Sequence, residues 1–404
     1  MANVSTEKAD PSWPKLLGSQ NWDSLLNPLD LNLREFILLC GDLCQATYDS
    51  FNGDQDSKYC GSCRYGKASL FDKVGFPLAS STLFVDTFLY ATSQVDLPLL
   101  VHSNADETWD RESNWMGYIA VSKDENAKAS GRREIYVMWR GTIRPLEWVN
   151  VLDAEQQPIL PTLARHNNRT DDDNIRVMKG WLTVYISSNQ DSPFTKLSAR
   201  DQLLTKIKEL VNRYKGENLS IIFTGHSLGA SLAVLSSFDV VRQLDELSAI
   251  PVCAIVFGCP QVGNNAFAKE LEKLKNLKIL HTRNVIDLIP HYPSHLLGYV
   301  DTGMELIIDT RKSPSLKDSS NPSDWHNLQA MLHVVAGWNG EGVEFALKVK
   351  RSLALVNKSC DFLKEEFHVP GSWWVEKNKG MVLDEDGDWV LAPPFEEDMP
   401  VPEF

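Results

Sequence analysis

The most regular pattern of apolar and polar positions runs from residue 197 to residue 284. Residues 197–217 carry leucine, isoleucine and valine at the spacing of one helical face, which predicts an amphipathic helix opened by Ser198. Strand-like apolar runs then alternate with runs of helical spacing: strands at 219–225, 252–258 and 277–284, helices at 227–244 and 264–274. Because the connections are short, this alternation predicts a parallel sheet with helices on both faces.

Upstream of this region the pattern is less regular. Residues 31–50 have helical spacing and predict one or two helices that pack on the core. Two β-rich runs, 114–124 and 134–142, predict the first strands of the sheet. Residues 143–176 then form a long insertion with a short apolar helix at its start and an acidic, polar end. An insertion of this length inside a compact domain is usually functional or mobile.

Downstream of the regular region the order of elements is less definite. We expect a strand from Glu305, a polar loop at 310–325, a helix from about Leu328 and a second helix over 343–350. The Trp-rich C-terminal region has dipeptides typical of hairpin turns: Lys379-Gly380 and Asp386-Gly387. The pattern therefore predicts an N-terminal helical extension packed on the core (1–114), a core (115–350) and a C-terminal extension with a hairpin (351–404).

Composition narrows the class of protein. Of 404 residues, 43% are hydrophobic and 23% charged, which is typical of a soluble globular chain. The net charge of −14 excludes binding to nucleic acid by neutralisation of phosphates, which needs a basic surface. The polar start has no apolar signal segment, and no window approaches the roughly 18 apolar residues of a membrane-spanning helix. We therefore expect a cytoplasmic protein.

The cysteines and two short motifs, at 60–63 and 384–388, could bind a metal or be ordinary loop sequence. The odd number of cysteines, seven, without a signal segment predicts reduced thiols. Cys60-Gly-Ser-Cys63 has the spacing of half a zinc site or of a redox pair, but no second half follows, which favours a loop. The acidic run 384–388 departs from the spacing of a calcium loop and favours a solvated turn. We expect no metal site.

The most informative motif is Gly225-His-Ser-Leu-Gly229, which matches G-x-S-x-G between a predicted strand and a predicted helix. A serine hydroxyl is a weak nucleophile unless a base takes its proton, and a sharp strand-to-helix turn raises it to where a base can reach it. Glycine at both flanks fits such a turn, since a Cβ there would crowd the neighbouring backbone. The pattern predicts Ser227 as a catalytic nucleophile.

An acid and then a histidine follow the serine in folds that carry this motif. Asp287 comes directly after the strand predicted at 277–284, where such an acid belongs; Asp301 and Asp309 are rivals without a clear strand before them. Of the later histidines, His326 lies at a loop-to-helix junction. His333 lies seven residues further on the same helical face, so periodicity does not separate the two. We favour His326, because a histidine inside an apolar helix face is more often a packed core residue.

A tetrahedral intermediate also needs two donors for its oxyanion. One is the N–H of the residue after the nucleophile, Leu228. The second belongs on a loop after an earlier strand, where Gly141 allows close backbone approach and Thr142 offers an N–H and a hydroxyl. Taken alone, this Arg-Gly-Thr sequence is also consistent with an ordinary turn.

In combination these motifs resemble the class 3 lipases, and more narrowly the plant phospholipase A1 type II group. The matching segments are YVMWRGT (136–142), LEWVNVLD (146–153), MKGW (178–181), IIFTGHSLGASLA (221–233), FGCPQVGNNAF (257–267), RNVIDLIP (283–290) and WHNLQAMLH (325–333). The resemblance implies an α/β-hydrolase fold with a mostly parallel central sheet. It also implies hydrolysis of the sn-1 acyl ester of phospholipids without a metal or cofactor.

The resemblance further assigns roles to residues. It implies Ser227, Asp287 and His326 as the catalytic residues and Thr142 and Leu228 as oxyanion donors. It places the lid of the family at about 143–160, with an apolar surface from Ile143, Leu146, Trp148, Val149 and Leu152. Such a lid would cover an acyl groove when closed and offer its apolar face to lipid when open. The alternative is a packed surface helix.

Other functions stay open on the sequence. One is a monoacylglycerol, triacylglycerol or galactolipid lipase that uses the same triad, because the chemistry is identical and the choice depends on the groove. Another is a non-catalytic, lipase-like signalling scaffold. The expected partners are a phospholipid or other acyl-lipid substrate and, transiently, a membrane surface. The sequence does not indicate an oligomeric state.

Overall fold

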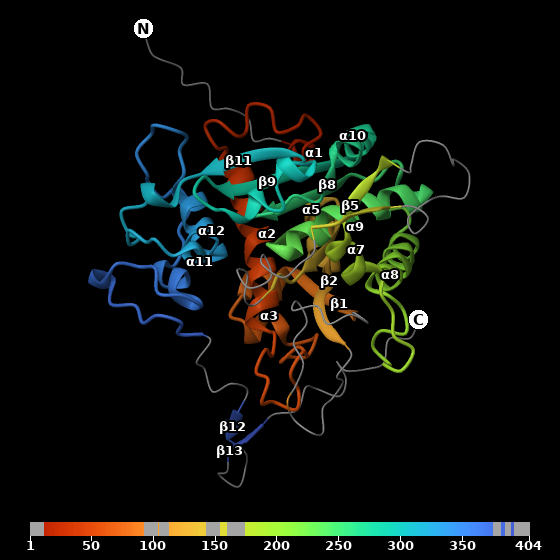
Figure 1. The fold of residues 1–404 in the computed structure, drawn as a ribbon, viewed down its shortest axis with the longest axis horizontal. Coiled ribbons are helices and arrows are strands. Elements are labelled where there is room, and N and C mark those ends of the chain that lie inside the picture. Colours follow the sequence, from red (N-terminus) through yellow and green to blue (C-terminus); the bar gives the residue numbers. More distant parts are fainter. Residues whose placement is uncertain are drawn as a thin grey trace.

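The computed structural model describes residues 12–92, 104, 113–142, 154–159, 174–374, 381–383 and 389–391 (Figure 1). Within these residues the largest element is a seven-stranded sheet. In their order across the sheet, its strands are β1 (Leu83–Ala91), β2 (Asn114–Ser122), β3 (Arg133–Trp139), β6 (Leu219–His226), β7 (Val252–Phe257), β9 (Leu277–Asn284) and β11 (Met304–Ile308). The expected strands from residue 114 onward are therefore present.

The sheet is mostly parallel, as the sequence predicts. Strands β3, β6, β7, β9 and β11 all run in one direction, and β1, β2 and β3 pair antiparallel at one side. The carboxyl ends of the parallel strands thus lie along one edge, where the loops that follow them meet. The loops after β3, β6 and β9 carry Thr142, Ser227 and Asp287.

One face of the sheet is covered by helices whose apolar sides pack against alternate strand residues such as Val137 and Phe223. The helices are α7 (Lys179–Ile186), α8 (Ala199–Arg213), α9 (Leu228–Gln243) and α10 (Asn265–Lys273). Side chains cap two of them: Ser198 accepts the N–H of Asp201 at the start of α8, and Asn264 caps α10. The predicted helix over 197–217 is thereby confirmed.

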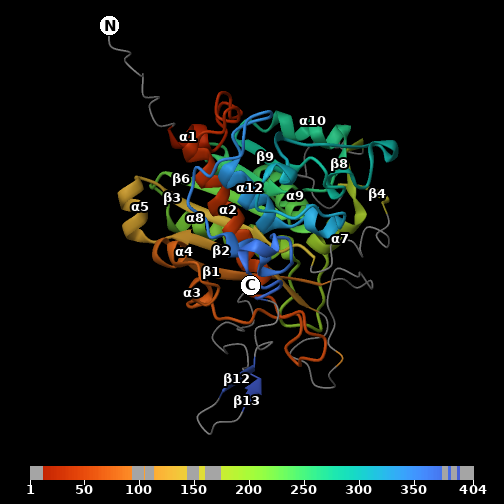
Figure 2. The same ribbon diagram turned by 90° about the vertical axis from the view of Figure 1, so that its left-hand side faces the viewer.

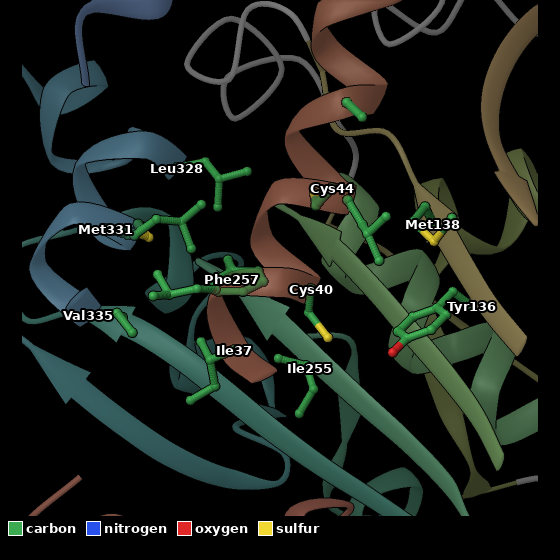
Figure 3. Packing of buried hydrophobic residues seen from close by; sticks show 14 of the residues in the cluster. Ile37, Cys40, Cys44, Tyr136, Met138, Ile255, Phe257, Leu328, Met331 and Val335 are labelled. Carbon is green, nitrogen blue, oxygen red and sulfur yellow. The ribbon is translucent and has the colours of Figure 1, made fainter. Parts of the chain in front are cut away.

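The opposite face is covered by α2 (Leu31–Asp49) and α12 (Leu328–Gly337), which lie side by side (Figures 1 and 2). Figure 3 shows Ile37 and Cys40 of α2 and Met331 and Val335 of α12 packed over the sheet. Successive side chains of a strand point to opposite faces of the sheet. The strand residues that contact α2 and α12 therefore alternate with those that contact α7 to α10. Both faces are therefore buried, which explains the nearly unbroken apolar runs.

Shorter elements complete the described part. A second sheet has the order β10 (Tyr299–Val300), β8 (Gly263–Asn264), β5 (Arg176–Met178) and β4 (Gln156–Pro158). The short helices are α1 (Trp13–Leu16), α3 (Leu70–Lys73), α4 (Pro77–Thr82), α5 (Asp124–Ser130) and α11 (Pro322–Trp325). The 3₁₀ helices are η2 (Asp245–Leu247), η3 (Ile289–His291), η4 (His295–Leu297), η5 (Thr310–Lys312), η6 (Leu353–Lys358) and η7 (Glu365–Phe367). The expected hairpin is represented by β12 (Met381–Leu383) and β13 (Trp389–Leu391), which pair antiparallel.

The prediction of a helix over 343–350 is wrong. The N–H groups of Ala346 and Lys348 donate to the carbonyls of Gly337 and Ala336 at the end of α12, so they do not form helical bonds within the segment. Val343 and Leu347, two apolar residues of this segment, are more than half exposed. The segment therefore crosses the end of α12 as irregular chain.

The two predicted extensions are closely joined to the core in the structure. Residues 83–91, within the N-terminal segment expected to be helical, form strand β1 of the main sheet. The C-terminal Lys358 forms a buried ion pair with Asp49 of α2, and Trp374 donates its indole N–H to the carbonyl of the same aspartate. The domain boundaries at 114/115 and 350/351 stay predictions.

The remaining structural expectations concern cysteines and membrane spans. All seven cysteines are thiols, and six of them are buried. Among the described residues, no cluster of three or more His, Cys, Asp or Glu side chains is arranged to hold a metal ion. In the same part of the chain, no helix combines the length and the apolar character that crossing a bilayer requires.

Candidate active site

Ser227 lies at the turn between β6 and α9. Its backbone has φ 59° and ψ −128°, a conformation that residues with a side chain rarely adopt, and the residue is completely buried. A Cβ at Gly225 would lie 2.2 Å from the Gly229 carbonyl oxygen, and one at Gly229 would lie 2.2 Å from that of Trp139. The two glycines of the motif therefore allow a tight strand-to-helix turn packed against the end of β3. This is the strained serine turn that the motif predicts.

Leu228 is the first residue of α9. Its N–H belongs to the first turn, which has no carbonyl acceptor one turn earlier within the helix. The aligned peptide dipoles also place partial positive charge at this end. The arrangement suits the predicted role of Leu228 as a donor to a developing oxyanion.

Asp287 and His326 form a buried pair. The Nδ1 atom of His326 lies 2.6 Å from Oδ2 of Asp287, and both side chains are about 1% exposed. The other carboxylate oxygen of Asp287 accepts the N–H of Ile289 at 3.0 Å. Asn284, at the end of β9, donates to the carbonyl of Trp325 at 2.9 Å, which ties the acid loop to the histidine loop. The aspartate is thus placed to hold the imidazole in one orientation.

Three of the buried polar atoms that lack a hydrogen-bond partner among the described residues lie in this region. They are Oγ of Ser227, Nε2 of His326 and Oγ1 of Thr142. A buried polar atom without a partner is costly, and such atoms are typical of sites that bind or transform a ligand. No hydrogen bond joins Ser227 to His326 in this structure; such catalytic bonds commonly tighten only in the complex with substrate.

His333, the alternative base, lies elsewhere. Its Nε2 atom is 2.8 Å from Oγ of Ser313, and its ring packs on Phe345. Burial lowers the pKa of His333 to about 4. The rival acids also have other partners, since Asp301 lies 3.3 Å from His295 and Asp309 binds Arg311 through two bonds. The structure thus brings together the pair that the sequence favours, while the catalytic roles stay a prediction.

The Arg-Gly-Thr segment after β3 packs on the serine turn. A Cβ at Gly141 would lie 2.5 Å from the carbonyl oxygen of His226, so glycine is needed for this approach. The guanidinium of Arg140 is buried, donates to the Gly141 carbonyl at 2.8 Å and lies over the ring of Phe51. Thr142, next in the chain, is 4% exposed. The loop is therefore tightly packed against the turn that carries the predicted nucleophile.

The predicted lid residues Ile143, Leu146, Trp148, Val149 and Leu152 lie outside the described residues. Of the predicted lid range 143–160, the structure describes 154–159, which include β4. Strand β4 pairs with β5 in the second sheet. The lid stays a prediction.

Comparison with known proteins identifies the family of the chain. Residues 136–297 match the family described as Lipase (class 3). Phospholipase A1-IIdelta of Arabidopsis thaliana is 59% identical over 410 aligned residues, which cover 97% of this chain and 98% of that protein. The chain belongs to the class 3 lipase family, in its plant phospholipase A1-II group. Phospholipase A1-II 5 of Oryza sativa subsp. indica is 55% identical, with 96% of this lipase and 84% of that protein covered.

Solved structures of fungal lipases are similar to this lipase at lower identity. Lipase II from Rhizopus niveus has 16% sequence identity and a TM-score of 0.40, with 73% of this chain and 81% of that chain covered. The lipase from Rhizopus microsporus var. chinensis has 17% identity and a TM-score of 0.39, with 74% of this chain and 76% of that chain covered.

Sequence reasoning missed three residues that contact the site of this lipase. Tyr48 and His226 form hydrogen bonds beside the predicted triad, and Gly258 lies against the histidine–aspartate pair. His226 occupies the variable position of G-x-S-x-G, directly before the serine, and this position could have drawn attention to it. In the sequence, Tyr48 is one more position on the apolar face of α2. The spacing of residues along one helix does not show which distant residue Tyr48 contacts.

Gly258 offers a direct test of the importance of this pair. Its φ is +51°, and a Cβ there would lie 2.8 Å from Cε1 of His326. We expect Gly258→Ala to lower kcat for ester hydrolysis by about 10- to 100-fold, because a small displacement of a catalytic group is costly. Steady-state kinetics on a soluble ester would measure the effect.

Gly131→Ala is the matched control. Gly131 also has a positive φ, +69°, but a Cβ there would meet no atom within 4 Å. Alanine at this position therefore introduces backbone strain of about 1–2 kcal/mol without a contact to the site. Equal kcat values for the two variants would show that the contact with His326 is unimportant.

Proposed function

We propose that this protein is a phospholipase A1, which hydrolyses the sn-1 acyl ester of phospholipids through an acyl-enzyme on Ser227. The observation that carries the proposal is the buried contact between His326 and Asp287 in a chain whose serine turn carries G-x-S-x-G. The name of a relative that is 59% identical over nearly the whole chain supports phospholipids as substrates.

The proposed reaction has two halves. In the first, Oγ of Ser227 attacks the ester carbonyl carbon while Nε2 of His326 takes the hydroxyl proton. Asp287 holds the Nδ1–H of the histidine and stabilises the imidazolium. The oxyanion of the tetrahedral intermediate accepts hydrogen bonds from Leu228 and Thr142. Collapse of the intermediate breaks the ester bond, and the lysophospholipid alcohol leaves with the proton from His326.

The second half returns the enzyme to its starting state. His326 takes a proton from a water molecule, and the hydroxide attacks the acyl carbon of the ester on Ser227. The same donors stabilise the second oxyanion. When the acyl–Oγ bond breaks, the serine oxygen recovers the proton from His326 and the fatty acid is released. One water is consumed for each ester, and protons balance without a metal or cofactor.

A panel of lipids tests the substrate class. With Ser227→Ala as the blank, fatty-acid release would be measured from a phosphatidylcholine, a galactolipid, a monoacylglycerol and a triacylglycerol in the same mixed micelles. We expect the phospholipid to give the highest kcat/KM, by at least about tenfold. A higher value for a galactolipid or an acylglycerol would replace the phospholipase assignment by the corresponding lipase. The proposal includes action in the cytoplasm, which fractionation would test.

We also propose transient contact with a membrane surface through apolar groups rather than through charge. With a net charge of −14, the protein has little electrostatic attraction to anionic lipid. At low salt, sedimentation of the Ser227→Ala variant with vesicles is expected to show no tighter binding to anionic than to zwitterionic lipid. Tighter binding to anionic vesicles, reversed by salt, would contradict this mode of approach.

A further inference from the structure

The hydroxyl of Tyr48 meets two parts of the proposed catalytic machinery. Tyr48 lies in the last turn of α2, on the face that covers the sheet. Its oxygen is 2.8 Å from Nδ1 of His226, the residue before the nucleophile. The backbone of Gly141 contacts the same hydroxyl so closely that a Cβ at Gly141 would lie 2.0 Å from it. One side chain of the N-terminal region therefore contacts both the oxyanion loop and the serine turn.

His226 connects this hydroxyl to the proposed base. The Nε2 atom of His226 is 2.8 Å from the backbone carbonyl oxygen of His326. The two imidazole rings are tilted at 34° with centroids 4.5 Å apart. Tyr48, His226 and the backbone of His326 thus form a continuous chain of contacts that ends at the base.

The positions of the protons in this chain follow from chemistry. A carbonyl oxygen only accepts, so Nε2 of His226 carries a proton and donates it to His326. Burial and the neighbouring His326 lower the pKa of His226 well below its ordinary value, which keeps the ring neutral. Its Nδ1 is then an acceptor, and the Tyr48 hydroxyl donates to it at 2.8 Å, with the His226 carbonyl as a more distant acceptor at 3.4 Å. Burial also raises the pKa of Tyr48, so the donor proton stays in place.

We propose that Tyr48 is a positioning residue that holds the neutral, Nε2-protonated ring of His226 in place and thereby fixes the backbone of the base His326 relative to Ser227 and the Gly141–Thr142 loop. This inference rests on the proposed function, because it assigns Tyr48 a role in the same acyl transfer. Tyr48 lies far outside residues 136–297, which match the family. The N-terminal helix therefore contributes to catalysis as well as to the core.

The neutral tautomer has a specific value during the reaction. When His326 takes the serine proton it becomes a cation, and a second cation 4.5 Å away would oppose this step. A neutral ring that donates to the His326 carbonyl adds no such repulsion and holds the loop in place. Without the Tyr48 hydroxyl, Nδ1 of His226 loses its hydrogen-bond donor, and only the bond from Nε2 to the His326 carbonyl still holds the ring.

Tyr48→Phe removes only the hydroxyl, and Tyr118→Phe is its matched control. The Tyr118 hydroxyl is also buried and also contacts α2, where it donates to the carbonyl of Leu43 at 2.8 Å. We expect Tyr48→Phe to lower kcat on p-nitrophenyl butyrate by about 10- to 100-fold with KM within about twofold. Tyr118→Phe should keep kcat within about twofold of the native value. Its melting temperature should nevertheless fall at least as much as that of Tyr48→Phe. Equal kcat values for both variants would overturn the inference.

Two further measurements separate positioning from a general loss of structure. In a double-mutant cycle with His226→Phe, the loss caused by Tyr48→Phe should become smaller, because its route to His326 is gone. Full additivity would contradict action through His226. Ring ¹⁵N spectra should show the Nε2–H tautomer of His226 in the native protein and a shifted Nδ1 resonance in Tyr48→Phe, because Nδ1 loses its donor. An unchanged Nδ1 resonance would also contradict the inference.

The inference and the proposed function fail in different ways. If Ser227→Ala kept full activity, the proposed acyl-enzyme mechanism itself would be wrong. If Ser227→Ala were inactive while Tyr48→Phe matched Tyr118→Phe, the mechanism would stand and only the role of Tyr48 would be lost.

Discussion

Ser227→Ala is expected to reduce ester hydrolysis by at least ~10⁴-fold while leaving the fold intact. Removal of the nucleophile of a serine triad leaves only the activity that binding and the oxyanion donors supply. The change deletes one oxygen atom that has no hydrogen-bond partner among the described residues, so it removes no bond from the fold. Steady-state hydrolysis of a phospholipid and labelling by a fluorophosphonate probe would measure the effect, and thermal unfolding would check the fold.

Ser231→Ala is the control for this result. Ser231 lies one turn further along α9 and is also buried, with its hydroxyl beside the thiol of Cys259. It should retain both turnover and labelling. Undiminished turnover in Ser227→Ala would end the acyl-enzyme account. Absence of labelling and turnover in the native protein would favour the non-catalytic scaffold instead.

His326→Ala is expected to be the second most damaging change, with a loss of kcat on the order of 10⁴-fold. The reason is the contact of its Nδ1 with Asp287, which no other described histidine shares. His333→Ala should change kcat by less than about tenfold. Because His333 is buried and bonded to Ser313, its loss should instead reduce the free energy of unfolding by about 1–3 kcal/mol. Kinetics and denaturant unfolding of both variants would measure the contrast.

The opposite ranking would move the role of base to His333. A comparable loss of kcat in both variants, with comparable loss of stability, would mean that the packing of α12 rather than proton transfer limits activity. The distinction therefore depends on measuring kcat and unfolding on the same preparations.

The serine turn was predictable because its signals are local. The strand, the G-x-S-x-G turn and the following helix occupy adjacent residues, and the glycines are required by contacts within that turn and with the end of β3. Asp287 was predictable for a related reason, since it directly follows a recognisable strand. For His326 the pattern left His333 open, and only the contact with Asp287 separates them.

What the sequence did not indicate depends on contacts between distant segments. The bond between Tyr48 and His226 joins residues 178 positions apart, and helical spacing describes Tyr48 only as part of a buried face. Strand β1 belongs to the sheet because it pairs with β2, although residues 92–113 separate the two strands in the sequence. The wrong prediction of a helix over 343–350 has the same cause, because the backbone of this segment bonds to the end of α12 and two of its apolar residues are exposed.

The most direct test of the central claim is a positional assay on a phospholipid with distinguishable acyl chains at sn-1 and sn-2. Native protein and Ser227→Ala would be incubated with this lipid, and the released fatty acid and the remaining lysophospholipid would be identified by mass spectrometry. The account predicts release of the sn-1 acid and a 2-acyl lysophospholipid by the native protein, and neither product by the variant. Release of the sn-2 acid, or equal release in both proteins, would contradict it.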